Sequence, residues 1–126
     1  MNITHVAVYV RDLEKSKDFY TRFFEGTSNE KYENAHGFSS YFITFSQGAK
    51  LELMTHKELV EKEAMDRTTG WSHIAFSVGT KEKVLALTES IVSEGYALLS
   101  PPRTTGDGYF ESCVSDPDGN RVEITE

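Results

Sequence analysis

Two histidines stand at the start of matching apolar stretches in this sequence, His5 in THVAVYV and His73 in SHIAFSV. Two glutamates follow them at nearly the same separation, Glu52 in LEL and Glu123 in VEI. Imidazole nitrogens and carboxylate oxygens are donors that divalent transition metals accept in proteins, and water can complete an octahedral shell. If these four side chains converge, the chain has the ligands of one divalent metal ion.

The residues around each candidate ligand alternate between apolar and polar, as in a half-buried β-strand. His5 shares a strand face with Ala7 and Tyr9, and valines occupy the opposite face. Glu52 likewise lies between two leucines that face the other way. In all four strands we expect the aliphatic face to pack under helices, so that the four ligands point away from the helix layer.

The sequence contains two copies of one pattern, and this internal repeat predicts a repeated structural unit. In each copy the histidine strand leads to a residue that caps helices, then to a periodic helical segment, and then to a glycine that can adopt the left-handed conformation. In the first copy the cap is Asp12, the helical segment covers residues 13–24 and the glycine is Gly26. In the second copy the cap is Thr80, the helical segment covers residues 84–92 and the glycine is Gly95.

Each copy then continues as antiparallel strands, predicted over residues 41–45 and 50–54 and over residues 109–115 and 121–125. A further short strand over residues 97–100 is expected to end at Pro101-Pro102. The charged stretch between the copies is expected to hold a short helix around residues 57–65.

The repeated order of elements predicts an α+β fold made of two similar modules, each with a strand, a helix and then two or three antiparallel strands. The modules span about residues 1–54 and 71–126, and residues 55–70 connect them. A length of 126 residues suits one compact domain with a real core, so we expect a single domain over residues 1–126.

The composition excludes two classes of binding partner. The net charge of -7 argues against binding to nucleic acid or to an anionic membrane surface, which both require clustered Lys and Arg. This charge leaves small molecules or other proteins as the expected partners. The sequence has no apolar run of membrane-spanning length and no secretory signal pattern, so we expect a cytoplasmic protein. The single cysteine, Cys113, is expected to be a buried strand residue and not a nucleophile.

With this repeat, the sequence resembles the vicinal oxygen chelate superfamily, also called glyoxalase I-like. The resemblance runs from THVAVYVRDLEKSKDFY through LELM and SHIAFSV to SDPDGNRVEITE, and it covers nearly the whole chain. It implies two paired βαβββ modules that form a curved mixed sheet around a metal-binding trough, the glyoxalase/bleomycin-resistance/dioxygenase fold. It also implies one divalent ion per site, zinc or nickel before cobalt or manganese, held by His5, Glu52, His73 and Glu123.

Glutamate at both carboxylate positions is similar to glyoxalase I, the lactoylglutathione lyase. The resemblance therefore implies a divalent-metal-dependent lyase or isomerase that acts on a small bidentate oxo substrate. By this resemblance Glu123 is the catalytic base that moves a proton between adjacent carbons, and Glu52 assists it. Bacterial glyoxalases of this size pair their subunits, so the resemblance also implies a homodimer.

The sequence departs from glyoxalase I where that enzyme holds glutathione. The arginine that binds a glutathione carboxylate there corresponds to Tyr9 here, and a Lys-Gly-Gly loop corresponds to Thr105-Gly106-Asp107. Besides Tyr9 and Asp107, Tyr109 and Glu111 are candidates for the substrate pocket. Acidic residues near an anionic thiol conjugate are unfavourable, so the identity of the thiol stays open.

Two other functions also stay open. One is a metal-free module that binds or sequesters a small molecule, as in the bleomycin-resistance branch, and the aromatic residues available for its walls are Phe38, Tyr41, Phe42, Tyr109 and Phe110. The intact ligand set argues against it, because burying charged groups without a cation is costly. The other is an epimerase or a thiol transferase with the same ion. His36 and His56 have no counterpart in the other copy and no strand register, and they are left outside the site.

Overall fold

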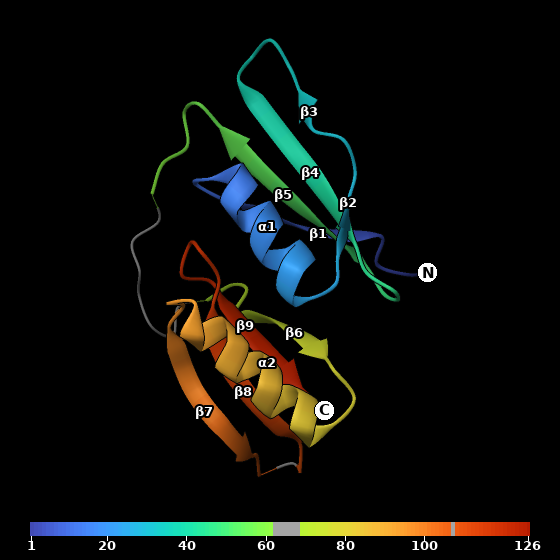
Figure 1. Cartoon of the computed structure of the whole chain (residues 1–126). Coiled ribbons are helices and arrows are strands. Elements are labelled where there is room, and N and C mark those ends of the chain that lie inside the picture. Colours follow the sequence, from blue (N-terminus) through green and yellow to red (C-terminus); the bar gives the residue numbers. More distant parts are fainter. Residues whose placement is uncertain (62–68, 107) are drawn as a thin grey trace. The chain divides into compact units, whose positions relative to one another are not determined.

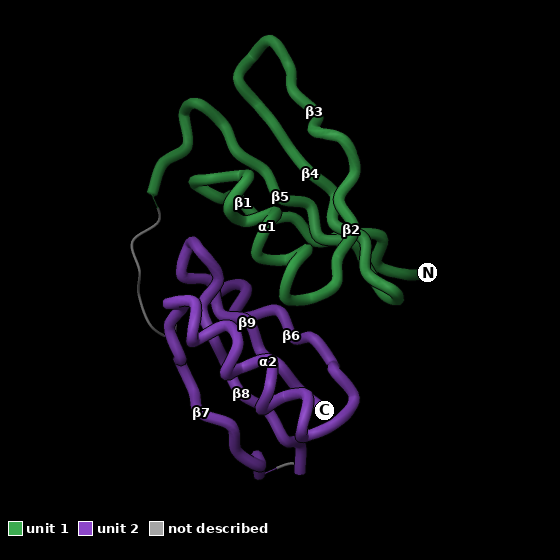
Figure 2. Tube along the Cα trace, in the orientation of Figure 1, with its two compact units in different colours: residues 1–64 green, residues 65–126 purple. Residues whose placement is uncertain are grey.

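The structure is a computed structural model, and it describes residues 1–61, 69–106 and 108–126. The chain divides into two compact units, unit 1 (Met1–Ala64) and unit 2 (Met65–Glu126), as Figure 2 shows. The division falls inside the predicted connector, so each unit contains one copy of the repeated pattern. Among the described residues, no helix combines the length and the apolar character that crossing a membrane requires.

Unit 1 is a mixed sheet with one helix (Figure 1). Its strand order is β1-β5-β4-β2, and β3 also pairs with β4. β1 runs parallel to β5, whereas β4 runs antiparallel to β5. The elements are β1 (His5–Tyr9), α1 (Leu13–Phe23), β2 (Thr27–Ser28), β3 (Tyr32–Glu33), β4 (Phe38–Thr44) and β5 (Lys50–His56).

Unit 2 repeats this plan. Its strand order is β6-β9-β8-β7, with β6 parallel to β9 and with β8 antiparallel to both of its neighbours. The last strand of each unit therefore lies beside the first. The elements are β6 (His73–Ser77), α2 (Lys81–Ser93), β7 (Leu98–Thr104), β8 (Phe110–Ser115) and β9 (Arg121–Thr125). The α+β class and the repeated order of strand, helix and strands are confirmed.

Both helices begin at the capping residue that the sequence predicted. The Asp12 side chain accepts a hydrogen bond from the backbone N–H of Lys15 at 3.0 Å, and the Thr80 side chain accepts one from Lys83 at 3.3 Å. Each bond satisfies an N–H group that the first helical turn leaves unpaired. The buried helix faces follow the three- and four-residue spacing of an amphipathic helix, with Leu13, Ser16, Phe19, Tyr20 and Phe23 in α1 and Val84, Thr88 and Ile91 in α2.

The core lies between each sheet and its helix. α1 contacts β4 and β5, and α2 contacts β7, β8 and β9 (Figure 1). Leu51 and Leu53 of β5 are buried, and so are Val122 and Ile124 of β9. Burial of one such side chain contributes about 1.5–3 kcal/mol. A one-residue register slip would expose all of them, so the glutamate between each pair is held on the opposite face, as predicted.

The glycine that follows each helix has a different role in the two units. Gly95 follows α2 with a φ of +93°, the left-handed conformation that was predicted for a helix end. The same prediction is wrong for Gly26, because Glu25 takes the positive φ of 54° after α1. Gly26 is instead required for space: a Cβ atom there would collide with Cγ2 of Ile43 and lie 3.1 Å from the carbonyl oxygen of Tyr20.

Gly26→Ala is expected to lower the free energy of unfolding by about 1–3 kcal/mol, because the added methyl group overpacks the contact between the end of α1 and β4. Gly106→Ala is the matched control, since a Cβ atom at Gly106 meets nothing within 4 Å. Denaturant unfolding followed by circular dichroism measures both free energies. Equal stability of the two variants would contradict the close approach at Gly26.

The strand before the second hairpin differs from its prediction. Pro101 and Pro102 were expected to end a strand over residues 97–100, but β7 contains both prolines and continues to Thr104. This is possible because β7 is an edge strand, where a residue without an N–H group can be accommodated. The register between β7 and β8 shifts on both sides of Ser100, which absorbs the missing donors.

The connector also differs from its prediction at its start. β5 extends to His56 and a turn follows at residues 57–58, so no helix is present over the described residues 57–61. The remainder of the helix predicted around residues 57–65 lies outside the described residues. Glu61 is tied to the loop after β1, because its carboxylate accepts hydrogen bonds from the Arg11 guanidinium at 2.6 and 2.5 Å.

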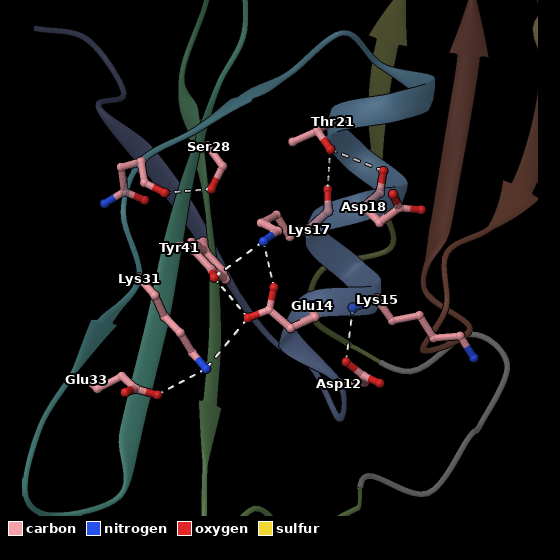
Figure 3. A network of polar contacts seen from close by, with 11 residues as sticks. Asp12, Glu14, Lys15, Lys17, Asp18, Thr21, Ser28, Lys31, Glu33 and Tyr41 are labelled. Carbon is pink, nitrogen blue, oxygen red and sulfur yellow. Dashed lines mark hydrogen bonds and ion pairs between the residues drawn. The ribbon is translucent and has the colours of Figure 1, made fainter.

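A polar network joins α1 to β4 and to the segment before β3 (Figure 3). The Tyr41 hydroxyl donates to Oε1 of Glu14 at 2.9 Å, and Lys17 Nζ donates to Oε2 of the same carboxylate at 2.6 Å. Lys31 Nζ lies 3.6 Å from Oε1 of Glu14. The hydrogen bonds from Lys17 and Tyr41 lower the pKa of the Glu14 carboxyl, so the network stabilises the ionised form.

Tyr41→Phe is expected to cost about 0.5–1.5 kcal/mol of stability near neutral pH, because one hydrogen bond to Glu14 is lost. A carboxyl whose folded-state pKa is lowered stabilises the protein above its unfolded pKa, and this stabilisation is lost as pH falls through the folded value. The difference between wild type and Tyr41→Phe should therefore shrink between about pH 7 and about pH 3. Denaturant unfolding across this range measures it, and a constant difference would contradict the role of Glu14.

Tyr32→Phe is the control for this measurement. Tyr32 is exposed, and its hydroxyl forms no hydrogen bond within the described part of the chain. Its removal is expected to change stability by less than about 0.5 kcal/mol at either end of the pH range.

Candidate functional site

The first candidate pair is formed by β1 and β5 of unit 1. In their parallel register Ala7 is the partner of Glu52, and His5 precedes Ala7 by two residues on the same face. His5 Nε2 lies 3.7 Å from Oε2 of Glu52. The imidazole is 45% exposed and the carboxylate 15% exposed, so the pair is open to a ligand from the side opposite α1.

The second pair is formed in the same way by β6 and β9 of unit 2. Ala75 is the partner of Glu123, and His73 precedes Ala75 on the same face. His73 Nε2 lies 3.2 Å from Oε2 of Glu123, with exposures of 38% and 22%. Both pairs thus use the same diagonal across a parallel strand pair. We call each histidine–glutamate pair a half-site.

A hydroxyl group contacts the other ring nitrogen of each histidine. Thr4 Oγ1 lies 3.2 Å from Nδ1 of His5, and Ser72 Oγ lies 3.2 Å from Nδ1 of His73. When Nδ1–H donates to the hydroxyl oxygen, Nε2 is left unprotonated and faces the glutamate, which is the arrangement that metal-binding histidines require. Sequence analysis missed both hydroxyls, although a hydroxyl residue precedes each histidine in THV and SHI.

The spacing of the donors fits a metal ion. Two donors held at about 2.1 Å from one ion are separated by about 3.0 Å at a right angle and about 3.4 Å at a tetrahedral angle. The observed 3.2 Å in unit 2 falls in this range, and the 3.7 Å in unit 1 needs a closure of a few tenths of an ångström. The alternative is an ion pair, which requires a protonated imidazole.

Each unit brings together two candidate ligands among its described residues. Over residues 1–61, 69–106 and 108–126, no group of three or more histidine, cysteine, aspartate or glutamate side chains is arranged to hold a metal ion. The structure thus brings His5 to Glu52 and His73 to Glu123, which are two of the contacts expected from the sequence.

The neighbours of the two half-sites differ. Phe42 is the register partner of Glu52, and its ring centroid lies 5.4 Å from that of His5 in an edge-to-face arrangement. Cys113 is the equivalent partner of Glu123. It is a buried strand residue, as predicted, and burial raises the pKa of its thiol, so it is poorly suited to act as a nucleophile.

The predicted substrate-pocket residues lie in different positions. Tyr9 ends β1, is exposed and shares the face of His5, about 13 Å away along the strand. Glu111 shares the face of Glu123, and Arg103 Nη2 lies 3.5 Å from its carboxylate, which offsets the negative charge that was expected there. Tyr109 is exposed and precedes β8. Asp107 lies outside the described residues.

The aromatic residues considered for a binding wall divide between the two sheet faces. Phe38 and Phe42 alternate with buried residues of β4 and lie on the open face with Glu52. Tyr41 is buried on the side of α1. Phe110 lies toward α2, where Lys81 Nζ is 5.3 Å from its ring centroid. Only the first two of these four can therefore line the open face of a half-site.

The other two histidines stay outside the half-sites. His56 does have a strand register, contrary to expectation, because it ends β5 as the partner of Phe38. Its Nδ1 accepts a hydrogen bond from the backbone N–H of Glu58 at 3.1 Å, which closes the turn after β5. His36 is exposed between β3 and β4, where its backbone N–H donates to the Asn34 side chain at 2.9 Å.

Comparison with known proteins identifies a matching family model and similar sequences. The sequence matches the model of the glyoxalase/bleomycin resistance protein/dioxygenase superfamily over residues 2–124. It is 30% identical over 124 residues to the uncharacterised protein YqjT of Bacillus subtilis, a match that covers 95% of this chain and 94% of that protein. It is 28% identical over 129 residues to a probable lactoylglutathione lyase of Vibrio cholerae, covering 98% and 89%.

The fold has close counterparts among solved structures. Glyoxalase I of Zea mays superimposes with a TM-score of 0.79 at 23% sequence identity over 98% of this chain. This chain spans only 44% of the maize protein, which is therefore more than twice as long. At this level of identity the likeness shows a shared fold.

Proposed function

The chain belongs to the glyoxalase/bleomycin resistance protein/dioxygenase superfamily, and on this premise we propose that it is a divalent-metal-dependent lyase or isomerase of the lactoylglutathione lyase type. Its substrate is a small molecule with two adjacent oxygen donors. The observation that carries the proposal is the repeated half-site, in which an imidazole and a carboxylate meet at 3.7 Å in one unit and 3.2 Å in the other. The relationship to a probable lactoylglutathione lyase supports the type of reaction.

The proposed ligands are His5 and Glu52 of unit 1 and His73 and Glu123 of unit 2. Two nitrogen and two oxygen donors with room for water suit zinc or nickel, and also cobalt or manganese. A bound ion of this kind acts as a Lewis acid that polarises the oxygens of a substrate. The proposal includes a cytoplasmic homodimer, by analogy with bacterial glyoxalases of this size.

Glu123 is the proposed base. Its carboxylate takes the proton from the carbon that bears the hydroxyl group of a hemithioacetal, and the electron pair of that C–H bond moves toward the neighbouring carbonyl. The proton then returns to the former carbonyl carbon, and the hydroxyl proton passes to the former carbonyl oxygen, so that a hydroxyacyl thioester forms without any external oxidant or reductant. The greater exposure of Glu123, 22% against 15% for Glu52, supports this assignment, and Glu52 assists.

A metal-free binding module is the second candidate, and a specific observation favours it. Phe38 and Phe42 lie on the open face of unit 1, where aromatic rings could stack on a flat ligand. An epimerase or a thiol transferase would use the half-sites with another oxygen substrate. These enzymes differ from the proposed one in their product, so product analysis separates them.

The test is the metal content of the purified protein, followed by substrate assays. We expect about one divalent ion per chain by elemental analysis, and turnover of hemithioacetals or related chelating substrates by the metal-loaded protein. If the protein stays metal-free after incubation with nickel, zinc, cobalt and manganese salts, the enzyme proposal fails and the binding module replaces it. If the protein binds metal but turns over no hemithioacetal, its reaction is that of another branch of the superfamily.

A further inference from the structure

A basic side chain stands directly beside the histidine of each half-site. Lys50 of β5 is the register partner of His5, and Arg121 of β9 is the register partner of His73. Adjacent strands lie about 4.8 Å apart, and partnered residues of a parallel pair project from the same face. Each cation therefore shares the open face with its imidazole and precedes the glutamate of its own strand by two residues.

Neither cation is paired with a carboxylate in the part of the chain that the structure describes. Lys50 and Arg121 are both exposed, and within the described residues their side chains form no ion pair and no hydrogen bond. The glutamate on the same strand instead faces its histidine, at 3.7 Å in unit 1 and 3.2 Å in unit 2. Arg103 provides the contrast, because it lies on the sheet of unit 2 together with Arg121 and pairs with Glu111 at 3.5 Å. Both cations are thus available to a ligand.

The two cations change the charge of the half-sites. In each half-site the glutamate contributes one negative charge, and a histidine that binds through Nε2 is neutral. The lysine or arginine beside the half-site contributes one positive charge. The set is therefore neutral before an ion binds, and a divalent ion leaves a positive excess. Two glutamates without these cations would balance the ion by themselves, and an uncharged substrate would then be preferred.

We propose that Lys50 and Arg121 are specificity-determining residues that favour, among the chelating substrates of the proposed site, those that carry a carboxylate next to the reacting carbons. This inference rests on the proposed function, since the ion supplies the charge that the substrate compensates. The planar guanidinium of Arg121 matches two carboxylate oxygens, and the ammonium of Lys50 acts as a point charge. The sequence carries the same signature in both copies, KLE and RVE.

The experiment compares two chelating probes on the nickel-loaded protein. Oxalate is a dianion, and acetohydroxamate offers a similar pair of oxygens with a lower charge. Isothermal titration is performed on wild type, Lys50→Met and Arg121→Met, with nickel affinity measured first and bound nickel measured again after each titration. Lys83→Met is the control, because Lys83 is an exposed lysine on α2, in the helix layer.

We expect Lys50→Met and Arg121→Met to bind nickel at least as tightly as wild type, and to bind oxalate about 10- to 100-fold more weakly. The loss for acetohydroxamate should be clearly smaller, and Lys83→Met should match wild type. Unchanged oxalate affinity, equal losses for both probes, or the same loss in Lys83→Met would overturn this inference while nickel binding still supports the proposed function. A wild-type protein that binds no nickel would overturn both.

Discussion

Glu123→Gln is expected to lower the turnover number of the metal-loaded protein by about 10²- to 10⁴-fold, the usual contribution of a general base. Glutamine keeps the shape of the side chain and one oxygen donor, but its amide cannot accept the substrate proton. The measurement is the initial rate of thioester formation at saturating hemithioacetal. Bound metal is determined in the same sample, so that a loss of turnover can be separated from a loss of the ion.

The matched control is Glu89→Gln. Glu89 is exposed on α2, in the helix layer of the same unit, so the substitution removes the same charge at a residue outside the proposed site. Its turnover should stay within a few-fold of wild type. If Glu123→Gln retains turnover while Glu52→Gln loses it, the base is Glu52. If both variants retain turnover with metal bound, neither glutamate moves the proton and the proposed mechanism is wrong.

His5→Ala and His73→Ala are each expected to weaken the binding of nickel or zinc by more than about 100-fold. Even the residues that orient metal ligands commonly contribute 10- to 100-fold, so loss of a ligand itself should exceed that range. Both histidines are substantially exposed, so neither substitution opens a cavity in the core. Isothermal titration of the metal-free variants gives the affinities, and circular dichroism establishes that they remain folded.

His36→Ala is the control for the metal measurement, because His36 is exposed in the turn between β3 and β4 and belongs to neither half-site. It should bind metal as wild type does. A loss confined to one of the two half-site variants would mean that a single unit holds the ion. Wild-type affinity in both variants would remove the histidines from the ligand set and, with them, the basis of the proposed function.

The sequence was sufficient to predict which strand face carries each ligand, because that depends on alternation over a few residues. Glu52 lies between two buried leucines, and its direction follows from their burial alone. Helix starts were predictable for the same reason, since Asp12 and Thr80 cap backbone groups three residues away. Both kinds of prediction depend only on residues that are close in the sequence, and the repeat provides each of them twice.

Features that depend on distant neighbours were not predictable. The diagonal contact of His5 with Glu52 requires the parallel register of β1 with β5, which the two segments do not specify by themselves. The space requirement at Gly26 comes from Ile43 on another strand, and the tolerance of Pro101 depends on β7 being at the sheet edge. Sequence analysis interpreted these residues from local propensity, and tertiary packing gave them other roles.

The two consecutive prolines of β7 also determine how the sheet of unit 2 can grow. Successive backbone N–H groups of a strand point to opposite sides, so one of the two missing donors belongs to the side facing β8 and the other to the free edge. A strand from another molecule that approached this edge would find an interrupted row of donors. Pro101 and Pro102 therefore protect the edge against strand addition and edge-to-edge aggregation, at the expense of the regular register with β8.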